Sequence, residues 1–228
     1  MIGITERGDA SIDNSWLTAV NNNMPCILIT KDPYKLSSMI NKDMNIIVHA
    51  TITGYGSTIL EPNVPQPSNA VKGLLKIISM IGIERTVLRV DPIIPYKIKG
   101  CNKIPFASDI PSDIINNIRK RISFMDNYPH VKQRMIDVGL EPLPYDFHAP
   151  LSKRIEIWEK LKRPEVCGEP SMECTGCISQ KDVEILNTNI QSNNTSKQRQ
   201  SCKCLSIKTE LLTNKKQCGH KCLYCYWR

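Results

Sequence analysis

The last dozen residues of the chain contain three closely spaced cysteines, Cys218, Cys222 and Cys225, and Tyr224 stands just before the last of them. Three thiolates within eight residues can face a single metal centre. An iron–sulfur cube held by three thiolates keeps one iron open for an outside ligand. The alternative is a zinc site completed by His220, although zinc prefers four closed ligands from paired elements. The terminal segment therefore predicts a metal centre of one of these two kinds.

A second group of cysteines precedes the terminal one. The chain has ten cysteines, and eight of them fall in its last third. Five of these come first, and they are Cys167, Cys174, Cys177, Cys202 and Cys204. They supply one more thiol than a four-ligand site requires, so they predict a second site that holds either a closed iron–sulfur cluster or structural zinc.

The sequence contains neither a secretory signal nor an apolar run of the roughly 20 residues that a membrane span needs. We therefore expect a cytoplasmic protein without a membrane partner. In that reducing compartment, clustered cysteines are more often metal ligands or redox groups than disulfides.

Basic side chains outnumber acidic ones by 30 to 22, and residues 151–228 carry six of the eight net positive charges. This excess has two interpretations. It can compensate anionic thiolate clusters, or it can form a surface that binds nucleic acid.

Short apolar strands alternate with helical stretches, which is typical of a parallel sheet with crossover helices. The expected strands are residues 2–4, 26–30, 45–53 and 86–90, the last broken by Asp91-Pro92, and residues 205–212 before the terminal cysteines. The expected helices are residues 69–82, two or more within 111–140 around Asn127-Tyr128-Pro129, and 151–162. The polar stretch 185–201 is expected to be a surface loop.

Polar residues follow the expected strands at the points where each one ends. They are Thr5, Glu6, Arg7 and Asp9 after the first strand, Thr30 and Lys31 after the second, Thr51 and Thr53 after the third, and Arg89 and Asp91 after the fourth. The carboxyl ends of parallel strands converge on one mouth, where the chemistry of such folds takes place. These residues predict a rim that holds a polar ligand.

The terminal spacing resembles the signature of radical S-adenosylmethionine (SAM) enzymes. Five segments resemble, in order and spacing, the barrel core of spore photoproduct lyase-like radical SAM proteins: residues 4–9, 28–31, 51–53, 61–65 and 89–95. In those relatives the three-cysteine loop precedes these strands, whereas here it ends the chain. The C-terminal part resembles a radical SAM-like group that carries the signature last, after a cysteine-rich segment and a Gln-Arg pair, here Gln198-Arg199.

The resemblance implies an α/β fold, a partial (open) TIM-like barrel of parallel strands that is circularly permuted, with the final strand beside the first. Permutation is tolerable because the termini of compact domains often lie close together. Residues 1–163 would form the permuted barrel core. Residues 164–204 would be a cysteine-rich segment with an auxiliary metal site, and residues 205–228 would supply the last strand and the cluster-binding loop.

The resemblance also implies roles for single residues. Cys218, Cys222 and Cys225 would bind a [4Fe-4S] cluster, with Tyr224 packed against it. The ligands of the auxiliary Fe–S or zinc site would be Cys167, Cys177, Cys202 and Cys204, with Cys174 as a spare or substitute. Cys26 is expected in the core, and Cys101 would be a loop thiol that is either inert or donates a hydrogen atom.

For SAM itself, Thr5-Glu6 stands where the family has a Gly-Glu pair that takes the amino group. Lys31 matches a lysine for the carboxylate, and Thr51 and Thr53 match polar residues near the ribose. Arg89 and Asp91 complete the expected cofactor-binding set. The plainer interpretation treats Glu6 and Lys31 as paired rim charges and the threonines as ordinary strand residues.

The resemblance implies an enzyme that reductively cleaves SAM to a 5′-deoxyadenosyl radical, with a reductant such as flavodoxin or ferredoxin as its partner. Kinship with photoproduct lyases and the basic C-terminal third favour a nucleic-acid base or nucleotide as substrate, with a peptide or small metabolite as the alternative. An alternative of another class is a non-catalytic zinc or Fe–S module that binds nucleic acid.

Overall fold

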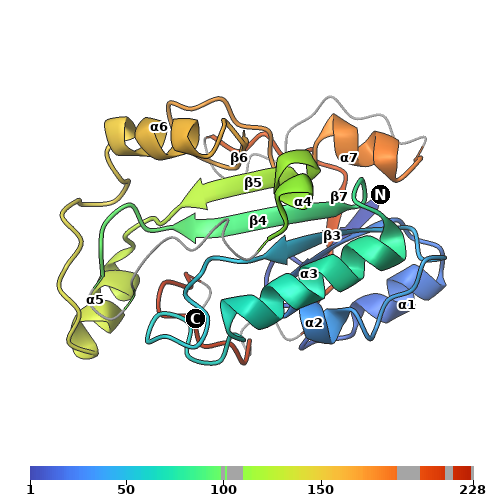
Figure 1. Cartoon of the computed structure of the whole chain (residues 1–228), viewed down its shortest axis with the longest axis horizontal. Helices are drawn as coiled ribbons and strands as arrows, with labels where there is room; N and C mark the ends of the chain where they lie inside the picture. The colour runs from blue at the N-terminus through green and yellow to red at the C-terminus, as the bar shows by residue number, and fades with distance from the viewer. Residues whose placement is uncertain (99–100, 102–109, 189–200, 214–217, 227–228) are drawn as a thin grey trace.

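The computed structural model describes residues 1–98, 101, 110–188, 201–213 and 218–226. Seven strands lie in this part of the chain: β1 (Ile2–Ile4), β2 (Cys26–Thr30), β3 (Ile46–Thr51), β4 (Thr86–Ile93), β5 (Arg119–Phe124), β6 (Glu165–Val166) and β7 (Lys208–Glu210). They form one parallel sheet in the order β6-β5-β4-β3-β2-β1-β7, which makes an open half-barrel (Figure 1).

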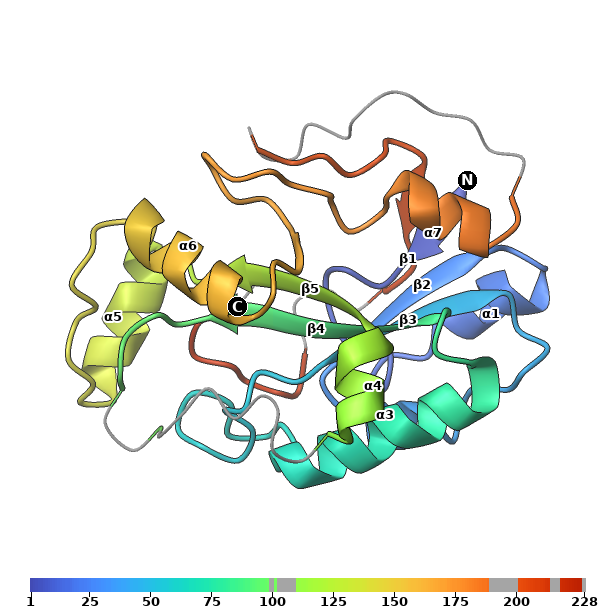
Figure 2. The same cartoon turned by 45° about the horizontal axis from the view of Figure 1, so that its top comes forward.

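The helices of the described residues connect these strands or flank them. They are α1 (Trp16–Asn21), α2 (Pro33–Leu36), α3 (Pro67–Ile81), α4 (Ser112–Asn117), α5 (Pro129–Asp137), α6 (Leu151–Lys160) and α7 (Gln180–Ile185). The long helix α3 runs along the sheet beside α1 and α2 (Figure 1), whereas α7 lies on the other side of the strands (Figure 2). In the described part of the chain, no helix has the length and apolar character needed to cross a bilayer.

Alternation of side chains along the strands decides what each face of the sheet contacts. Leu28 and Val48 point to one face and pack in a buried cluster with Trp16 of α1 and Ile77 of α3. Ile2, Ile4, Ile27, Ile29 and Ile47 point to the other face, where they pack against α7 and the cysteine-rich segment. Since successive residues of a strand face opposite sides, both faces of the central strands are apolar and buried.

The strand that follows the cysteine-rich segment lies beside the first strand of the chain. β7 pairs with β1 in parallel, with Ile2 opposite Lys208 and Ile4 opposite Glu210. The expectation that the final strand lies beside the first is therefore confirmed. Gly3 permits this close approach, because a Cβ atom there would lie 2.5 Å from Cδ1 of Leu211.

The strands expected at residues 2–4 and 26–30 form with those bounds, and the helices expected at 69–82 and 151–162 form within a few residues. Two expectations were wrong. β4 continues through Asp91-Pro92 to Ile93, with a shift of register against β5. Residues 119–124, expected to be helical, form strand β5, whose Arg119 and Arg121 are paired with carboxylates.

Most of the polar stretch expected to be a loop, including Gln198-Arg199, lies outside the described residues.

Candidate functional site

A cavity of about 440 Å³ lies at the carboxyl ends of the strands. Residues after or near the ends of β1 to β4 line one part of it, namely Glu6, Asp9, Lys31, Thr51, Arg89 and Asp91. The remaining wall includes all three terminal cysteines and four from the earlier group, Cys167, Cys177, Cys202 and Cys204. The fold therefore brings both cysteine groups and the polar strand ends to one cavity.

The period of two along the strands places several of these polar side chains on a single face. His49 and Thr51 alternate with the core residues of β3, and Arg89 and Asp91 do the same in β4. Ser123 of β5 continues this row, and its hydroxyl contacts the carboxylate of Asp91. The parallel register of β3, β4 and β5 therefore places polar residues that are far apart in sequence side by side on one face of the sheet.

The terminal cysteine loop is held against the segment that follows β3. The backbone N–H of Leu223 donates to the carbonyl of Leu60 (2.9 Å), and the side-chain amide of Asn63 donates to the carbonyl of Gly219 (2.7 Å). Arg134 of α5 donates to the carbonyl of Cys225. Leu223 is also buried beside Cys222 in one apolar cluster. These contacts keep the cysteines of the loop at the cavity.

A buried Asp–His pair ties the terminal loop to the end of β1. Nε2 of His220 lies 2.8 Å from Oδ2 of Asp9, and its Nδ1 lies 3.2 Å from the carbonyl of Asn63. Burial raises the pKa of Asp9, but the bond and charge of His220 outweigh burial and lower it to about 2. Both ring nitrogens of His220 have protein partners in this arrangement, which disfavours the zinc site that His220 would complete.

We expect Asp9→Asn to lower the free energy of unfolding by about 1–3 kcal/mol, because an amide nitrogen would then face donors that now share the carboxylate. These donors include the N–H of Lys31 (2.6 Å) and the hydroxyl of Thr30 (2.8 Å). Urea unfolding measures the loss. Asp32→Asn is the control, since Asp32 caps α2 near the surface and Asn caps a helix equally well. Equal stability of the two variants would contradict the role given to Asp9.

Lys31 lies at the centre of a polar group that joins β2, the segment after β3 and the terminal loop. Its Nζ is 2.9 Å from Oε1 of Glu61, 2.9 Å from the hydroxyl of Tyr224 and 3.1 Å from the carbonyl of Asp91. Burial favours the neutral amine, but the carboxylate of Glu61 outweighs burial and raises the pKa of Lys31. Lys31 is therefore a fixed positive charge at the cavity.

Two polar atoms at the cavity have no hydrogen-bond partner among the described residues. They are Oγ1 of Thr51 and Nε of Arg89. The guanidinium of Arg89 also contacts the carboxylate of Asp91, which helps to keep its charge. Buried polar atoms are rarely left unpaired, and Thr51 and Arg89 are the residues of the described cavity wall that still lack a polar partner for one atom each.

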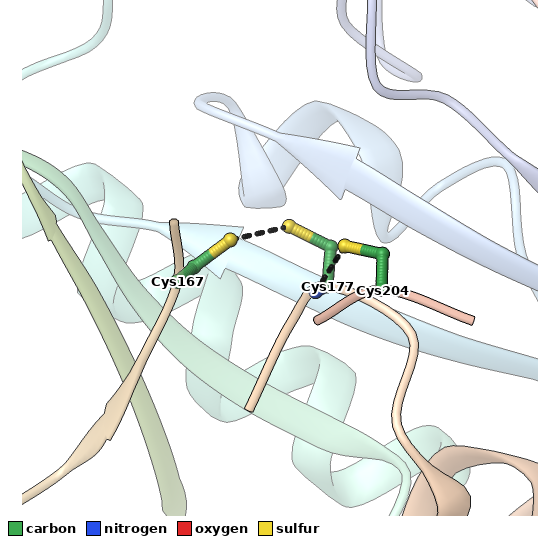
Figure 3. Close-up of side chains that lie close together, drawn as sticks. All are labelled: Cys167, Cys177 and Cys204. Atoms are coloured by element: carbon green, nitrogen blue, oxygen red, sulfur yellow. Dashed lines mark hydrogen bonds between the residues drawn. The ribbon is translucent and has the colours of Figure 1, made fainter. Parts of the chain in front are cut away.

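Cys167, Cys177 and Cys204 form a compact group of thiols (Figure 3). Their Sγ atoms all lie within 4.8 Å of one another, and those of Cys167 and Cys177 are 3.1 Å apart. The N–H of Cys177 donates to Sγ of Cys204 (2.9 Å). In the part of the chain that the structure describes, no other set of three or more Cys, His, Asp or Glu ligand atoms is gathered so closely. These three residues have the arrangement of a metal site.

Positive charges surround the compact group. Nη1 of Arg121 donates to the carbonyl of Cys177 (3.0 Å). Hydrogen bonds from Cys167 and Cys204 lower the pKa of the Cys177 thiol, and the charges of Arg89 and Arg121 lower it further. The same sharing of hydrogen bonds raises the pKa of Cys167 and Cys204. The group therefore has one thiol that is readily ionised, as a metal ligand must be.

Gly176→Ala is expected to disrupt the compact group. Gly176 has φ +85°, and a Cβ atom there would lie 2.6 Å from the backbone nitrogen of Cys204. The variant must therefore separate Cys177 from Cys204 and weaken metal binding, which equilibrium dialysis with zinc measures. Gly139→Ala is the matched control, because Gly139 has φ +77° but open space around the added Cβ. Equal zinc affinity in both variants would contradict the prediction.

The family model described as Domain of unknown function (DUF1848) matches residues 17–227. The chain belongs to this family. Both cysteine groups lie within the DUF1848 match, while β1 and the residues Glu6 and Asp9 precede it. Comparisons with curated proteins and with solved structures found no match.

The residues expected to bind SAM divide into two sets in this DUF1848 chain. Glu6, Lys31, Thr51, Arg89 and Asp91 line the cavity. Two others do not: Oγ1 of Thr5 accepts from the N–H of Ile29 (2.7 Å), and Oγ1 of Thr53 donates to Glu61 (2.8 Å). Neither threonine is part of the cavity wall, and both hydroxyls bond within the protein, so the two residues support the strand ends.

Cys101 lies apart from the cavity. Its side chain is 8% exposed and packs in the apolar cluster around Leu60 and Met125, with Sγ 3.5 Å from the hydroxyl of Thr58. The structure thus offers no support for Cys101 as a hydrogen donor to a ligand of the cavity. Cys26 is fully buried, as expected for a core residue.

Sequence reasoning gave no role to several residues at or beside the cavity. Glu61 does not line the cavity itself but pairs with Lys31, which does; it lies in a segment that the resemblance singled out, although the ion pair was not foreseen. Tyr128 and Tyr226 do line the cavity, and their rings stack with centroids 5.8 Å apart. The position of Tyr226, one residue after Cys225, was the available signal; nothing local marks Tyr128.

Proposed function

We propose that this protein is a radical SAM enzyme of the spore photoproduct lyase-like kind. One observation carries the proposal: Cys218, Cys222 and Cys225 line the same cavity as the polar residues at the strand ends. The order of the matching segments, described above, supports the proposal independently. The position of β7 beside β1 supports a circular permutation, because a barrel with a relocated start needs such an adjacency.

The donors of the terminal loop fit a [4Fe-4S] cluster with one open iron. The loop offers three thiols, and His220 is engaged elsewhere. The three sulfurs do not gather as closely as those of the compact group, which suits a cube because its ligands bind different irons. Burial raises the pKa of Cys222 to about 12, and the charge of Lys31 opposes this, so Lys31 favours the thiolate that a cluster requires.

In this proposal the cavity also binds SAM. A cluster held by Cys218, Cys222 and Cys225 would supply the one-electron reduction that cleaves SAM and so starts hydrogen abstraction from the substrate. Lys31 and Arg89 would attract the SAM carboxylate, and Thr51 would donate to a ribose oxygen. Glu6, which accepts from Lys208 (2.5 Å), would meet the amino group. The walls of the cavity and the bound substrate together would limit the access of water to the reactive carbon.

A nucleic-acid base or nucleotide is the proposed substrate class. The stacked rings of Tyr128 and Tyr226 line the cavity, and aromatic side chains are surfaces on which bases stack. The excess of basic residues in the C-terminal third suits a phosphate-bearing ligand. A peptide or small metabolite would make less use of these features.

The proposal includes an auxiliary metal site in the earlier cysteine group and an external reductant such as flavodoxin or ferredoxin. All ten cysteines are free thiols, which supports the proposed location of the protein in the reducing cytoplasm. The auxiliary site would stabilise the fold of the cysteine-rich segment and would face the substrate in the cavity.

The test is anaerobic reconstitution of the full chain with iron and sulfide, followed by addition of SAM and dithionite. We expect a brown protein whose reduced electron paramagnetic resonance spectrum changes on addition of SAM, and 5′-deoxyadenosine in the products. A colourless zinc protein, or a cluster insensitive to SAM, combined with salt-dependent binding to DNA or RNA, would instead support the nucleic-acid-binding module.

A further inference from the structure

The sulfur atoms of the compact cysteine group lie closer together than the ligands of a four-iron cluster would. Zinc–sulfur bonds of about 2.3 Å place the sulfurs of a tetrahedral ion about 3.8 Å apart. The Sγ atoms of Cys167, Cys177 and Cys204 lie within 4.8 Å of one another, which matches the spacing around one ion. A four-iron cube binds each cysteine to a different iron and requires a wider separation. The geometry therefore favours a single ion.

The compact group is also rigidly positioned on the sheet. The N–H of Cys167 donates to the carbonyl of Ile122 in β5 (2.9 Å), and the N–H of Leu205 donates to the carbonyl of Ile178 (3.1 Å). Arg121, which is fully buried, holds the carbonyl of Cys177. Three ligands from two separate segments are thus fixed before a metal binds, which keeps the ligand geometry from depending on the ion.

The three thiols face the cavity as well as one another, since all of them line it. Structural zinc sites are closed by four protein ligands, whereas reactive zinc sites have three and keep the fourth position open. Three thiolates and one divalent ion carry a net negative charge. Arg89, Arg121 and Lys208, which act electrostatically on these thiols, compensate that charge.

We propose that Cys167, Cys177 and Cys204 hold one divalent ion of the zinc class, whose fourth coordination position opens into the cavity. An incoming ligand with a sulfur or ring-nitrogen donor would occupy that position. The use of this ion as an anchor for the substrate rests on the proposed function, because the cavity must then also hold the SAM that reacts with the substrate. The metal site itself is independent of that function.

Cobalt replaces zinc in such sites and reports its ligands by colour, so Co²⁺ is the probe. The terminal cysteines are first removed together, as Cys218→Ala, Cys222→Ala and Cys225→Ala in the full chain, which separates this test from that of SAM cleavage. We expect one Co²⁺ per chain, with thiolate-to-cobalt absorption and the visible bands of a four-coordinate ion. We expect imidazole, a ring-nitrogen donor, to shift those bands by displacing water.

Two further changes in this background decide between three and four cysteine ligands. Cys177→Ser should weaken cobalt binding at least ~100-fold, beyond the ~10–100-fold that changes outside the ligand set cost. Cys202, whose thiol hydrogen-bonds to that of Cys204, lies outside the compact group, so Cys202→Ala should lower the affinity by less than ~100-fold and leave the thiolate absorption unchanged. Three results would each overturn the proposal. The first is a loss of one thiolate's share of the absorption in Cys202→Ala, and the second is a set of visible bands that imidazole does not shift. The third is the presence of iron and sulfide in place of one bound ion.

Discussion

A Cys222→Ala protein, reconstituted anaerobically and reduced in the presence of SAM, is expected to form no more 5′-deoxyadenosine than a mixture without protein. Cys222 would be the middle ligand of the proposed cluster, and it lies near Lys31, whose charge favours its thiolate. Removing it leaves two thiols, too few to hold a cube with a single open iron. Chromatography of the quenched reaction measures the product, and absorbance near 400 nm measures the loss of the cluster.

The control for this prediction is Cys26→Ala. Cys26 is as deeply buried as any cysteine of the chain, but it begins β2 beside Gly3 of β1, in the same apolar cluster as Leu211, and does not line the cavity. This variant is expected to keep the cluster and the product, although it loses some stability from the small space left behind. Undiminished 5′-deoxyadenosine in Cys222→Ala would show that the terminal loop is not the cluster site.

The second large effect is expected from Arg121→Met, which should lower the free energy of unfolding by about 3–5 kcal/mol. Arg121 is fully buried and pairs with Glu165 (2.5 Å) and Asp182 (3.5 Å), and it donates to the carbonyl of Cys177. Methionine fills similar space but leaves Asp182, which is also fully buried, with only Arg119 as a cationic partner among these residues. Urea unfolding measures the loss.

Arg163→Met is the matched control, because Arg163 forms an ion pair with Glu159 on the surface of the protein. Exposed pairs of this kind contribute about 1 kcal/mol or less. We further expect Cys177 to react more slowly with a thiol reagent at neutral pH in Arg121→Met than in Arg163→Met, because the charge of Arg121 helps to lower the pKa of the Cys177 thiol and the thiolate is the reactive form. Equal stability and equal thiol reactivity would contradict the anchoring role of Arg121.

The strands that sequence reasoning located well are the fully apolar ones. β1 and β2 consist of short runs of Ile, Leu and neighbouring small residues, and their side chains are buried on both faces of the sheet. In a parallel sheet covered on both sides, hydrophobic burial alone decides where such strands form. The amphipathic spacing of α3 was equally informative, because one face of that helix packs on the sheet.

Strand β5 escaped prediction because its local sequence, Arg119-Lys120-Arg121, is unlike that of a buried strand. Its guanidinium groups become acceptable in the interior only when Glu165 of β6 and Asp182 of α7 arrive from distant parts of the chain. Burial of a charge depends on its partner, and the partner here lies more than forty residues away. No window of local sequence contains that information.

In the candidate site too, some features follow from local sequence and others only from the tertiary structure. The spacing of Cys218, Cys222 and Cys225 and the polar residues after the strands determined, from the sequence alone, which side chains were candidates for chemistry. Only the tertiary structure decided that the two cysteine groups share a cavity and that Cys167, Cys177 and Cys204 are the compact set. It also decided that Thr5, Thr53 and Cys101 stay off the cavity wall. Local spacing limits which thiols of one loop can meet, whereas contacts between distant segments depend on how strands and helices pack.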